Sequence, residues 1–333
     1  MSMASVNTVS IIIVALNAEK ALPFLLDDIS RQTIASEGLE LILVDSASAD
    51  STRSIMNAYA HSVSFPVKVL SNPKKWLACG INLALKEATG DAVIRLDAHA
   101  RIPEDFIEKN VAALADSENI VGGSVLSTPP ADSWSAVMRS LDTSRFCGGA
   151  APFRNPGSAR YVDTLAYALY RRNVFDRVGF YDERLRRTED NEMHYRMRQA
   201  GYRFRFCPEI VSTHAARDSL IGHIRQKWGN GYWIGRTMHI QPRCFAPRHF
   251  APLLFVSLLI LFGMLSLVSP VPFAVLACSY LCLDLYFTAK AALETPLGRG
   301  LTVITLPFLF PLLHFSYGLG TLVGLLTLEK KYA

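Results

Sequence analysis

The stretch INLALKEATGDAVIRLDAHA, residues 81–100, contains the pattern that decides the fold of this chain. Its first half has a helix-compatible spacing, and residues 92–96 form a short β-branched run of the kind found in buried strands. The same unit recurs along the chain, with strands predicted at 9–15, 39–44, 67–70, 92–96 and 120–121 and helices at 19–31, 51–61 and 76–89. This alternation predicts an α/β domain whose sheet is mostly parallel and covered by helices on both faces.

Polar residues stand where three of these predicted strands end. Asn17 follows the first strand, Asp45 follows the second, and Asp97 with His99 follows the strand at 92–96. Polar residues end strands in many proteins. Ligands of open α/β sheets bind outside the carboxyl ends of the strands, so the coincidence on one edge favours a binding site.

The segment Asp97-Ala98-His99 is the candidate metal site. An acidic residue, one spacer and a second ligand after a buried strand can hold a divalent cation on a diphosphate. Oxygen ligands suit Mg²⁺ or Mn²⁺, and the imidazole of His99 favours Mn²⁺ modestly. Such a cation would neutralise charge on a leaving nucleoside diphosphate.

A second acidic segment, LVDSASADST at residues 43–52, carries Asp45 and Asp50. Asp45 at the strand end is expected to contact the base or the ribose of a nucleotide. Asp50 or Ser48 is expected to cap the following helix, since both residue types accept hydrogen bonds from free helix N–H groups.

The pattern becomes irregular after Gly122, and Gly, Pro and Arg are frequent at 127–160. A helix is predicted at 190–200, followed by strands at 202–206 and 210–213. His214 follows the last strand and precedes Arg217, so it is a candidate third metal ligand, with Arg217 neutralising phosphate charge. An ordinary structural histidine is the alternative.

The C-terminal part is predominantly apolar. Residues 250–268 contain no charged residue, and residues 271–289 contain only Asp284. Residues 301–328 contain His314 but no Asp, Glu, Lys or Arg. These lengths predict a region at 250–333 with about three transmembrane helices. Pro307 and Pro311 would kink the third helix or divide it into a re-entrant pair. Three spans would place residues 329–332 outside, an orientation that Lys330 and Lys331 disfavour.

Basic and aromatic residues gather between these regions, at 217–249. Their spacing predicts a basic amphipathic helix and linker in the membrane interface; a helix packed on the catalytic domain is the alternative. No secretory signal precedes the first domain, at 1–216, so this domain is expected in the cytoplasm.

Composition excludes several other classes. The net charge of +5 is slight and forms no dense basic block, so nucleic acid is not an expected partner. The six cysteines show no C-x-x-C or C-x-x-H spacing, so neither a zinc site nor a disulfide framework is indicated.

Four segments together resemble inverting family 2 glycosyltransferases with the GT-A fold: VSIIIVALNA (9–18), ILVDSASADST (42–52), residues 81–100, and VGFYDERLRRTEDNEMHYRMRQAGYRF (178–204). The resemblance extends over about residues 8–240. RLDAHA, VDTLAYALYRRNVF (162–175) and the apolar C-terminal region are most similar to the succinoglycan-biosynthesis branch, which elongates saccharides on an undecaprenyl diphosphate carrier.

The resemblance implies a role for each matching residue. Asp45 would contact the nucleoside of the nucleotide-sugar, expected to be a UDP-sugar, and Asp97 the metal-diphosphate centre. Asn17 is expected to bind the same nucleotide-sugar because of its position after the first strand. Asp190, in Thr188-Glu189-Asp190, would be the catalytic base. His99 departs from the family pattern, which more often has a second aspartate there.

The expected function is therefore transfer of a sugar to a polyprenyl-diphosphate-linked saccharide in exopolysaccharide or cell-surface glycan synthesis. The enzyme would be a multi-pass protein of the cytoplasmic membrane with its catalytic domain facing the cytoplasm. A polyprenyl-phosphate sugar synthase is the alternative. A nucleotidyltransferase would not need three spans, and an inactive membrane scaffold would not need Asp45, Asp97 and Asp190 together.

Overall fold

The computed structural model describes residues 6–115, 118–147, 151–154, 157–214 and 219–327. The chain divides into two compact units, each formed by two segments. The first unit comprises Met1–Leu126 and Pro152–Ala215, and the second comprises Ser127–Ala151 and Ala216–Ala333.

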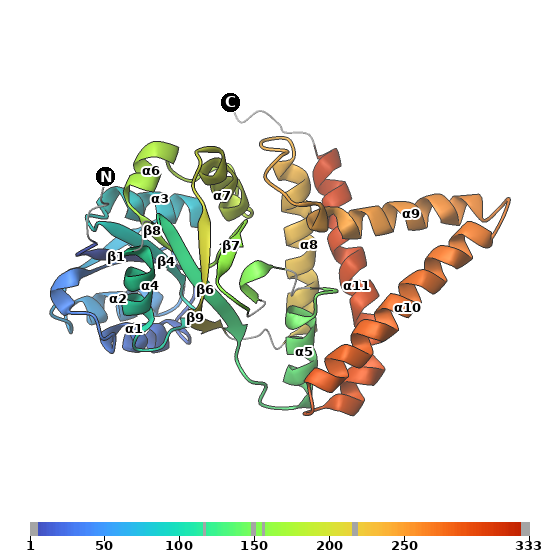
Figure 1. Ribbon diagram of the computed structural model, residues 1–333, viewed down its shortest axis with the longest axis horizontal. Coiled ribbons are helices and arrows are strands. Elements are labelled where there is room, and N and C mark those ends of the chain that lie inside the picture. The colour runs from blue at the N-terminus through green and yellow to red at the C-terminus, as the bar shows by residue number, and fades with distance from the viewer. Residues whose placement is uncertain (1–5, 116–117, 148–150, 155–156, 215–218, 328–333) are drawn as a thin grey trace. The chain divides into compact units, whose positions relative to one another are not determined.

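The first unit is built on one mixed sheet (Figure 1). Four parallel strands lie in the order β3 (Val67–Ser71), β2 (Leu39–Asp45), β1 (Val9–Ala15) and β4 (Ala92–Asp97). The sheet continues through β8 (Leu169–Arg171), β6 (Ile120–Ser127), β9 (Phe204–His214) and β5 (Ala100–Arg101), and β7 (Arg160–Val162) pairs with β9. The predicted α/β fold is confirmed, and the strand pairs β4–β8, β6–β8, β5–β9 and β7–β9 are antiparallel.

Helices cover both faces of this sheet because successive side chains of a strand point to opposite faces. In β1, Ile11 and Ile13 join one apolar core while Ile12 joins the other. The first core includes residues of α1 (Leu22–Ser30), α2 (Thr52–Ala60) and α4 (Phe106–Ala115). The second includes residues of α3 (Leu77–Glu87), α6 (Asn173–Val178) and α7 (Glu189–Gln199). Two short 3₁₀ turns, Ser36–Gly38 and Pro152–Arg154, complete this unit.

The second unit is helical. It contains α5 (Ser133–Thr143), α8 (Leu220–Thr237), a 3₁₀ turn at Pro247–Phe250, α9 (Ala251–Leu265), α10 (Val271–Glu294) and α11 (Arg299–Leu326). Three segments are long and apolar enough to cross a membrane: Pro247–Leu265, Val271–Glu294 and Arg299–Leu326. The tail at 329–332 lies outside the described residues.

The predicted basic amphipathic helix corresponds to α8, one face of which lies on α11. A Cβ added to Gly231 would lie 2.0 Å from the Tyr317 carbonyl oxygen, and one added to Gly235 would lie 2.3 Å from that of Thr321. Such close approach is possible only because these positions carry no side chain.

Candidate active site

The carboxyl ends of three neighbouring parallel strands bring the predicted acidic residues to one edge of the sheet. Asp45, the last residue of β2, is in register with Ala15 of β1, and Asp97, the last residue of β4, is in register with Val14. Asn17 follows the end of β1 by two residues. The edge predicted from the sequence therefore exists.

Asn17 connects two loops at this edge. Its backbone, with φ of 51°, is in the left-handed region, which Asn tolerates better than most residues. Its amide oxygen accepts a hydrogen bond from the Ala49 N–H at 2.8 Å, and its own N–H donates to the Ser48 hydroxyl at 3.0 Å. The Ser48 hydroxyl therefore takes part in the contact between the loops that follow β1 and β2. Asp50 accepts bonds from the Thr52 N–H and hydroxyl at the start of α2, but the N-cap position is Ser51, which makes no side-chain capping bond, so neither Asp50 nor Ser48 is the predicted cap.

Asp45 is a buried carboxylate, 3% exposed. The Ser48 N–H donates to one of its oxygens at 3.2 Å, and Arg53 lies 3.8 Å from the other. Because the Arg53 side chain is 46% exposed, this ion pair is weakened by solvent.

Asp97 accepts bonds from two residues that the sequence analysis did not identify. Arg95 donates to one carboxylate oxygen at 3.0 Å, and the Tyr167 hydroxyl donates to the other at 3.2 Å. Burial alone raises the pKa of Asp97, but the charges of Arg95 and His99 outweigh it and hold this pKa below its usual range. Asp97 is therefore ionised, and its side chain remains 31% exposed.

Arg95 also connects this strand end to the first turn of α7. Its guanidinium lies 3.8 Å from the carboxylate of Glu189, which is buried. Burial and the neighbouring charge of Asp190 raise the pKa of Glu189 to about 7. Asp190, half-buried beside it, accepts bonds from the backbone and side-chain amides of Asn191 at 2.8 and 3.0 Å.

The segment that leads into α7 is fixed by residues after β3. Lys74 pairs with Glu183 at 2.7 Å, and the Arg186 guanidinium lies 3.8 Å from the centre of the Trp76 ring. Asn82 of α3 donates to the Tyr181 carbonyl at 2.8 Å. These pairs are remote in sequence, so no local pattern indicated them.

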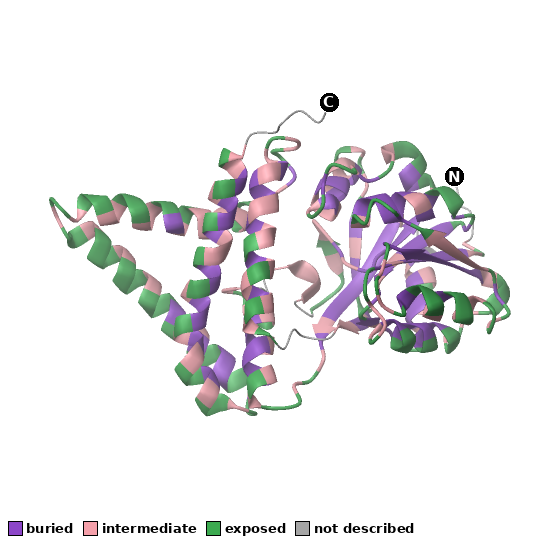
Figure 2. Cartoon of the chain, turned by 180° about the vertical axis from the view of Figure 1, so that it is seen from behind, coloured by how far each residue is buried: buried purple, intermediate pink, exposed green. Residues whose placement is uncertain are grey.

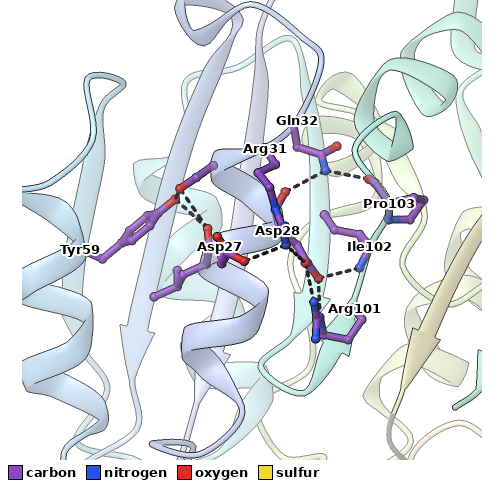
Figure 3. Close-up of polar contacts among 10 residues, drawn as sticks. Asp27, Asp28, Arg31, Gln32, Tyr59, Arg101, Ile102 and Pro103 are labelled. Carbon is purple, nitrogen blue, oxygen red and sulfur yellow. Dashed lines mark hydrogen bonds and ion pairs between the residues drawn. The ribbon is translucent and has the colours of Figure 1, made fainter.

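His214 is the last residue of β9, and His99 lies in the turn between β4 and β5. Ala100 of β5, which follows His99, pairs with His214 of β9. Strand β5 is held in place by Asp28, whose carboxylate accepts bonds from the Arg101 guanidinium at 2.6 and 2.8 Å and from the Ile102 N–H at 3.1 Å (Figure 3). This clamp sets the course of the chain just after Asp97 and His99.

Within the described part of the chain, no three His, Cys, Asp or Glu side chains gather closely enough to hold a metal ion by themselves. Arg217 lies outside the described residues. Asp97 with His99 remains the candidate pair, and His214 the candidate addition.

Residues 10–179 match the family model described as glycosyl transferase family 2. The chain belongs to this family. The resemblance predicted from the motifs is confirmed, and the protein is a glycosyltransferase. The match includes Asn17, Asp45, Asp97 and His99 and ends before α7.

This glycosyltransferase is 27% identical over 225 residues to the succinoglycan biosynthesis protein ExoA of Rhizobium meliloti (strain 1021), covering 66% of this chain and 67% of that protein. It is 24% identical over 226 residues to the dolichyl N-acetyl-alpha-D-glucosaminyl phosphate 3-beta-D-2,3-diacetamido-2,3-dideoxy-beta-D-glucuronosyltransferase of Methanococcus voltae, covering 66% and 70%. Among solved structures, the mannosyltransferase PcManGT from Pyrobaculum calidifontis, in complex with GDP-Man and Mn²⁺, is similar with a TM-score of 0.60 at 21% identity, covering 98% of this chain and 88% of that one. This likeness shows the GT-A fold.

Proposed function

We propose that this glycosyltransferase moves a sugar from a nucleotide-diphosphate sugar, expected to be a UDP-sugar, to a polyprenyl-diphosphate-linked saccharide. The observation that carries the proposal is that Asp45 and Asp97 end the two strands on either side of β1, at one edge of the sheet, and that Arg95 links Asp97 to the first turn of α7. The names of the two relatives, which refer to succinoglycan synthesis and to a dolichyl-linked sugar, support a saccharide acceptor in cell-surface glycan or exopolysaccharide synthesis.

The donor would lie along the carboxyl edge of the sheet. Asp45 would accept hydrogen bonds from the nucleoside, since its carboxylate is buried at a strand end where nucleotides bind in open α/β sheets. Asn17 would fix the loops around the nucleotide, and Arg217 would neutralise phosphate charge.

A divalent cation, Mg²⁺ or Mn²⁺, fits the donor chemistry of Asp97, His99 and His214. Such ions are commonly held at nucleotide sites by one or two protein ligands and the phosphates of the substrate, so a complete protein cage is unnecessary. The ionised, partly exposed carboxylate of Asp97 supports this role. When bound, the ion would stabilise the negative charge of the leaving diphosphate.

Asp190 would act as the general base. The acceptor hydroxyl oxygen would bond to the anomeric carbon while the bond from that carbon to the diphosphate oxygen breaks, and its proton would pass to the Asp190 carboxylate. Attack opposite to the leaving group gives inversion. The position of Asp190 in the first turn of α7 stabilises its negative charge through the helix dipole.

The acceptor class is tested by incubating membranes that contain the full chain with single nucleotide-sugars and lipid-linked saccharides, and measuring lipid products by mass spectrometry. We expect a product heavier by one sugar residue and an equal amount of released nucleoside diphosphate. A lipid monophosphate sugar as the only product would instead identify a polyprenyl-phosphate sugar synthase.

A further inference from the structure

The three apolar helices of the second unit differ in how much of their surface the protein covers. In an apolar 18-residue stretch of each segment, only 6% of the residues are buried in Pro247–Leu265, which contains α9, and 11% in α10, whereas 44% are buried in α11 (Figure 2). A helix surrounded by lipid needs no protein cover, but a half-covered helix presents only one side to its surroundings. The environments of α9–α10 and α11 therefore differ.

Seven of the eight exposed large apolar side chains of α11 form a single stripe, and the eighth, Val303, lies off it near the start of the helix. The seven recur every three or four residues, which places them on one face of the helix: Ile304, Phe308, Leu312, Phe315, Leu319, Val323 and Leu326. The stripe runs along the helix from its second turn to its last residue. One continuous apolar stripe is the feature of a helix that lies in the plane of a membrane interface.

The opposite face of α11 is covered by helices that carry charges. Gly320 and Gly324 approach the backbone of α8, where an added Cβ would lie 2.5 Å from the Trp228 carbonyl oxygen and 2.1 Å from that of Tyr232. Because this contact is at backbone distance, α8 must lie wherever the second half of α11 lies. A membrane-crossing α11 would draw Arg225 and Lys227 of α8 into the hydrocarbon, which is unfavourable.

Helices α9 and α10 form a hairpin that extends away from α11, and the loop that joins the two helices is its tip (Figure 1). Near its base, Cβ addition at Gly318 of α11 would meet Val256 at 2.6 Å, and Phe255 contacts Phe315. From residue 257 to residue 283, a fully described stretch, no residue is buried, and α10 becomes buried again at Asp284. The hairpin therefore projects from α11.

The tip of this hairpin is apolar. Leu267 is 91% exposed, Val268 90% and Val271 63%, and the sequence between Arg248 and Asp284 contains no Asp, Glu, Lys or Arg. The projecting arm from Val256 to Leu267 extends about 17 Å at the helical rise per residue. A hydrocarbon core is about 30 Å thick, so an arm of this length ends within it.

We propose that α11 lies in the plane of the membrane, with its apolar stripe in lipid, and that the α9–α10 hairpin enters from the same side as a re-entrant anchor whose tip remains in the hydrocarbon. The partner of this surface is the lipid bilayer. The chain would then enter and leave the membrane on one side. This inference does not depend on the sugar chemistry proposed above.

The test measures depth in vesicles of phosphatidylethanolamine and phosphatidylglycerol. Single cysteines replace Ile304, Leu312, Val323 and Val268 of the full chain after its own cysteines have been changed to serine, and each receives a nitroxide whose accessibility to oxygen and to a water-soluble nickel complex gives its depth. We expect equal, shallow depths at the three α11 positions and a greater depth at Val268. Glu37→Cys, in the exposed 3₁₀ turn Ser36–Gly38 of the first unit, is the aqueous control.

A spanning α11 would give a different profile, because Ile304 and Val323 would then be about 28 Å apart along the membrane normal. A maximum of depth at Leu312 would overturn the in-plane assignment. Reaction of Ser269→Cys with a membrane-impermeant maleimide added to the outer face of intact cells would overturn the re-entrant assignment.

A charge at the tip provides a second test that keeps the native cysteines. In the re-entrant arrangement Val268→Asp places a carboxylate in hydrocarbon, so recovery of the chain in the membrane fraction should fall about tenfold or more. Leu297→Asp should leave recovery unchanged. Equal recovery of both variants and the native chain would contradict a lipid-embedded tip.

Discussion

At the scale of single residues, the site depends on a charged side chain inside a buried strand. Arg95 interrupts the aliphatic run of β4 and lies between the carboxylates of Asp97 and Glu189. A partly buried cation with two acidic partners reduces the repulsion between groups that a catalytic site needs close together. The charged Arg95 within the apolar run AVIRLD could have indicated a polar contact at this strand. Its partner Glu189 is remote in sequence, so no local pattern indicated the pair.

The metal assignment predicts the behaviour of Asp97 and His99. Asp97→Ala should abolish transfer because the principal ligand is lost, and His99→Ala should reduce it strongly. Excess chelator should reproduce the loss in the native enzyme. Thermal unfolding of each variant checks the fold, and full activity of both variants in chelator would exclude a metal at this position.

The raised pKa of Glu189 predicts a pH-dependent stability. The folded state keeps the Glu189 proton up to about pH 7, whereas the unfolded carboxyl loses it near its ordinary value of 4.5. Stability from this group is therefore fully present below about 4.5 and falls as pH rises towards 7, by at most about 1.4 kcal/mol per pH unit. Glu189→Gln should remove this fall.

The measurement is the thermal midpoint of the metal-free chain between pH 5 and 8. The native protein should lose stability across this range more steeply than Glu189→Gln. Parallel curves for the two proteins would show that Glu189 does not hold a proton in the folded state.

At the scale of elements, the parallel strands were predictable because their apolar runs and end residues are local. The predicted strands at 9–15, 39–44 and 92–96 agree with β1, β2 and β4 within one residue. The run at 120–121 underestimates β6, which continues through Gly122 and Gly123 to Ser127. A Cβ at Gly123 would lie 1.8 Å from the Ile210 carbonyl oxygen, so these glycines permit close strand packing rather than end the strand.

Helix α5 was not predicted within the irregular stretch, because this short amphipathic segment is flanked by Gly, Pro and Arg and its apolar partners lie on α11. Its start is defined by reciprocal bonds between Asp132 and Ser135, a capping box. Val137 and Leu141 pack with Leu306 and Phe310 in one apolar cluster. A local sequence pattern cannot indicate packing between residues this far apart in the chain.

The Asp28 clamp predicts a large stability difference between neighbouring aspartates. Asp28→Ala removes a buried carboxylate that accepts bonds from the Ile102 N–H and from Arg101, whose side chain is 43% exposed, and we expect a loss of about 1–3 kcal/mol. Asp27 pairs with Arg31 at 2.7 Å on the surface, so Asp27→Ala should change stability by about 0.5 kcal/mol or less. Chemical denaturation of both variants gives the comparison, and equal losses would refute the clamp.

The α8–α11 contact predicts which glycines tolerate a methyl group. Gly235→Ala must displace the α11 backbone and should cost about 1–3 kcal/mol through overpacking. At Gly222 an added Cβ would meet the Ser219 Cβ at 3.6 Å, an ordinary contact, so Gly222→Ala should be neutral or stabilising. Thermal unfolding in detergent compares them. A stable Gly235→Ala would contradict the close packing on which the in-plane position of α11 rests.

At the scale of the whole molecule, the chain combines an α/β unit with an apolar helical unit, and both units are discontinuous in sequence. Apart from Arg217, the residues proposed for donor binding and proton transfer belong to the first unit, and the helices proposed to bind lipid belong to the second. The proposed water-soluble donor and lipid-linked acceptor would require these two kinds of surface in one enzyme.

The central claim is that a saccharide hydroxyl is activated by Asp190, and the most direct test is the transfer rate of Asp190→Asn measured beside its donor affinity. Asparagine keeps the shape of the side chain but cannot take a proton, so the rate should fall by about 10²–10⁴-fold while donor binding is unchanged. Asp182→Asn, the same substitution at a surface ion pair with Arg184, should retain the native rate. A near-native rate in Asp190→Asn would contradict the claim and indicate an acceptor that is already ionised, such as a lipid phosphate.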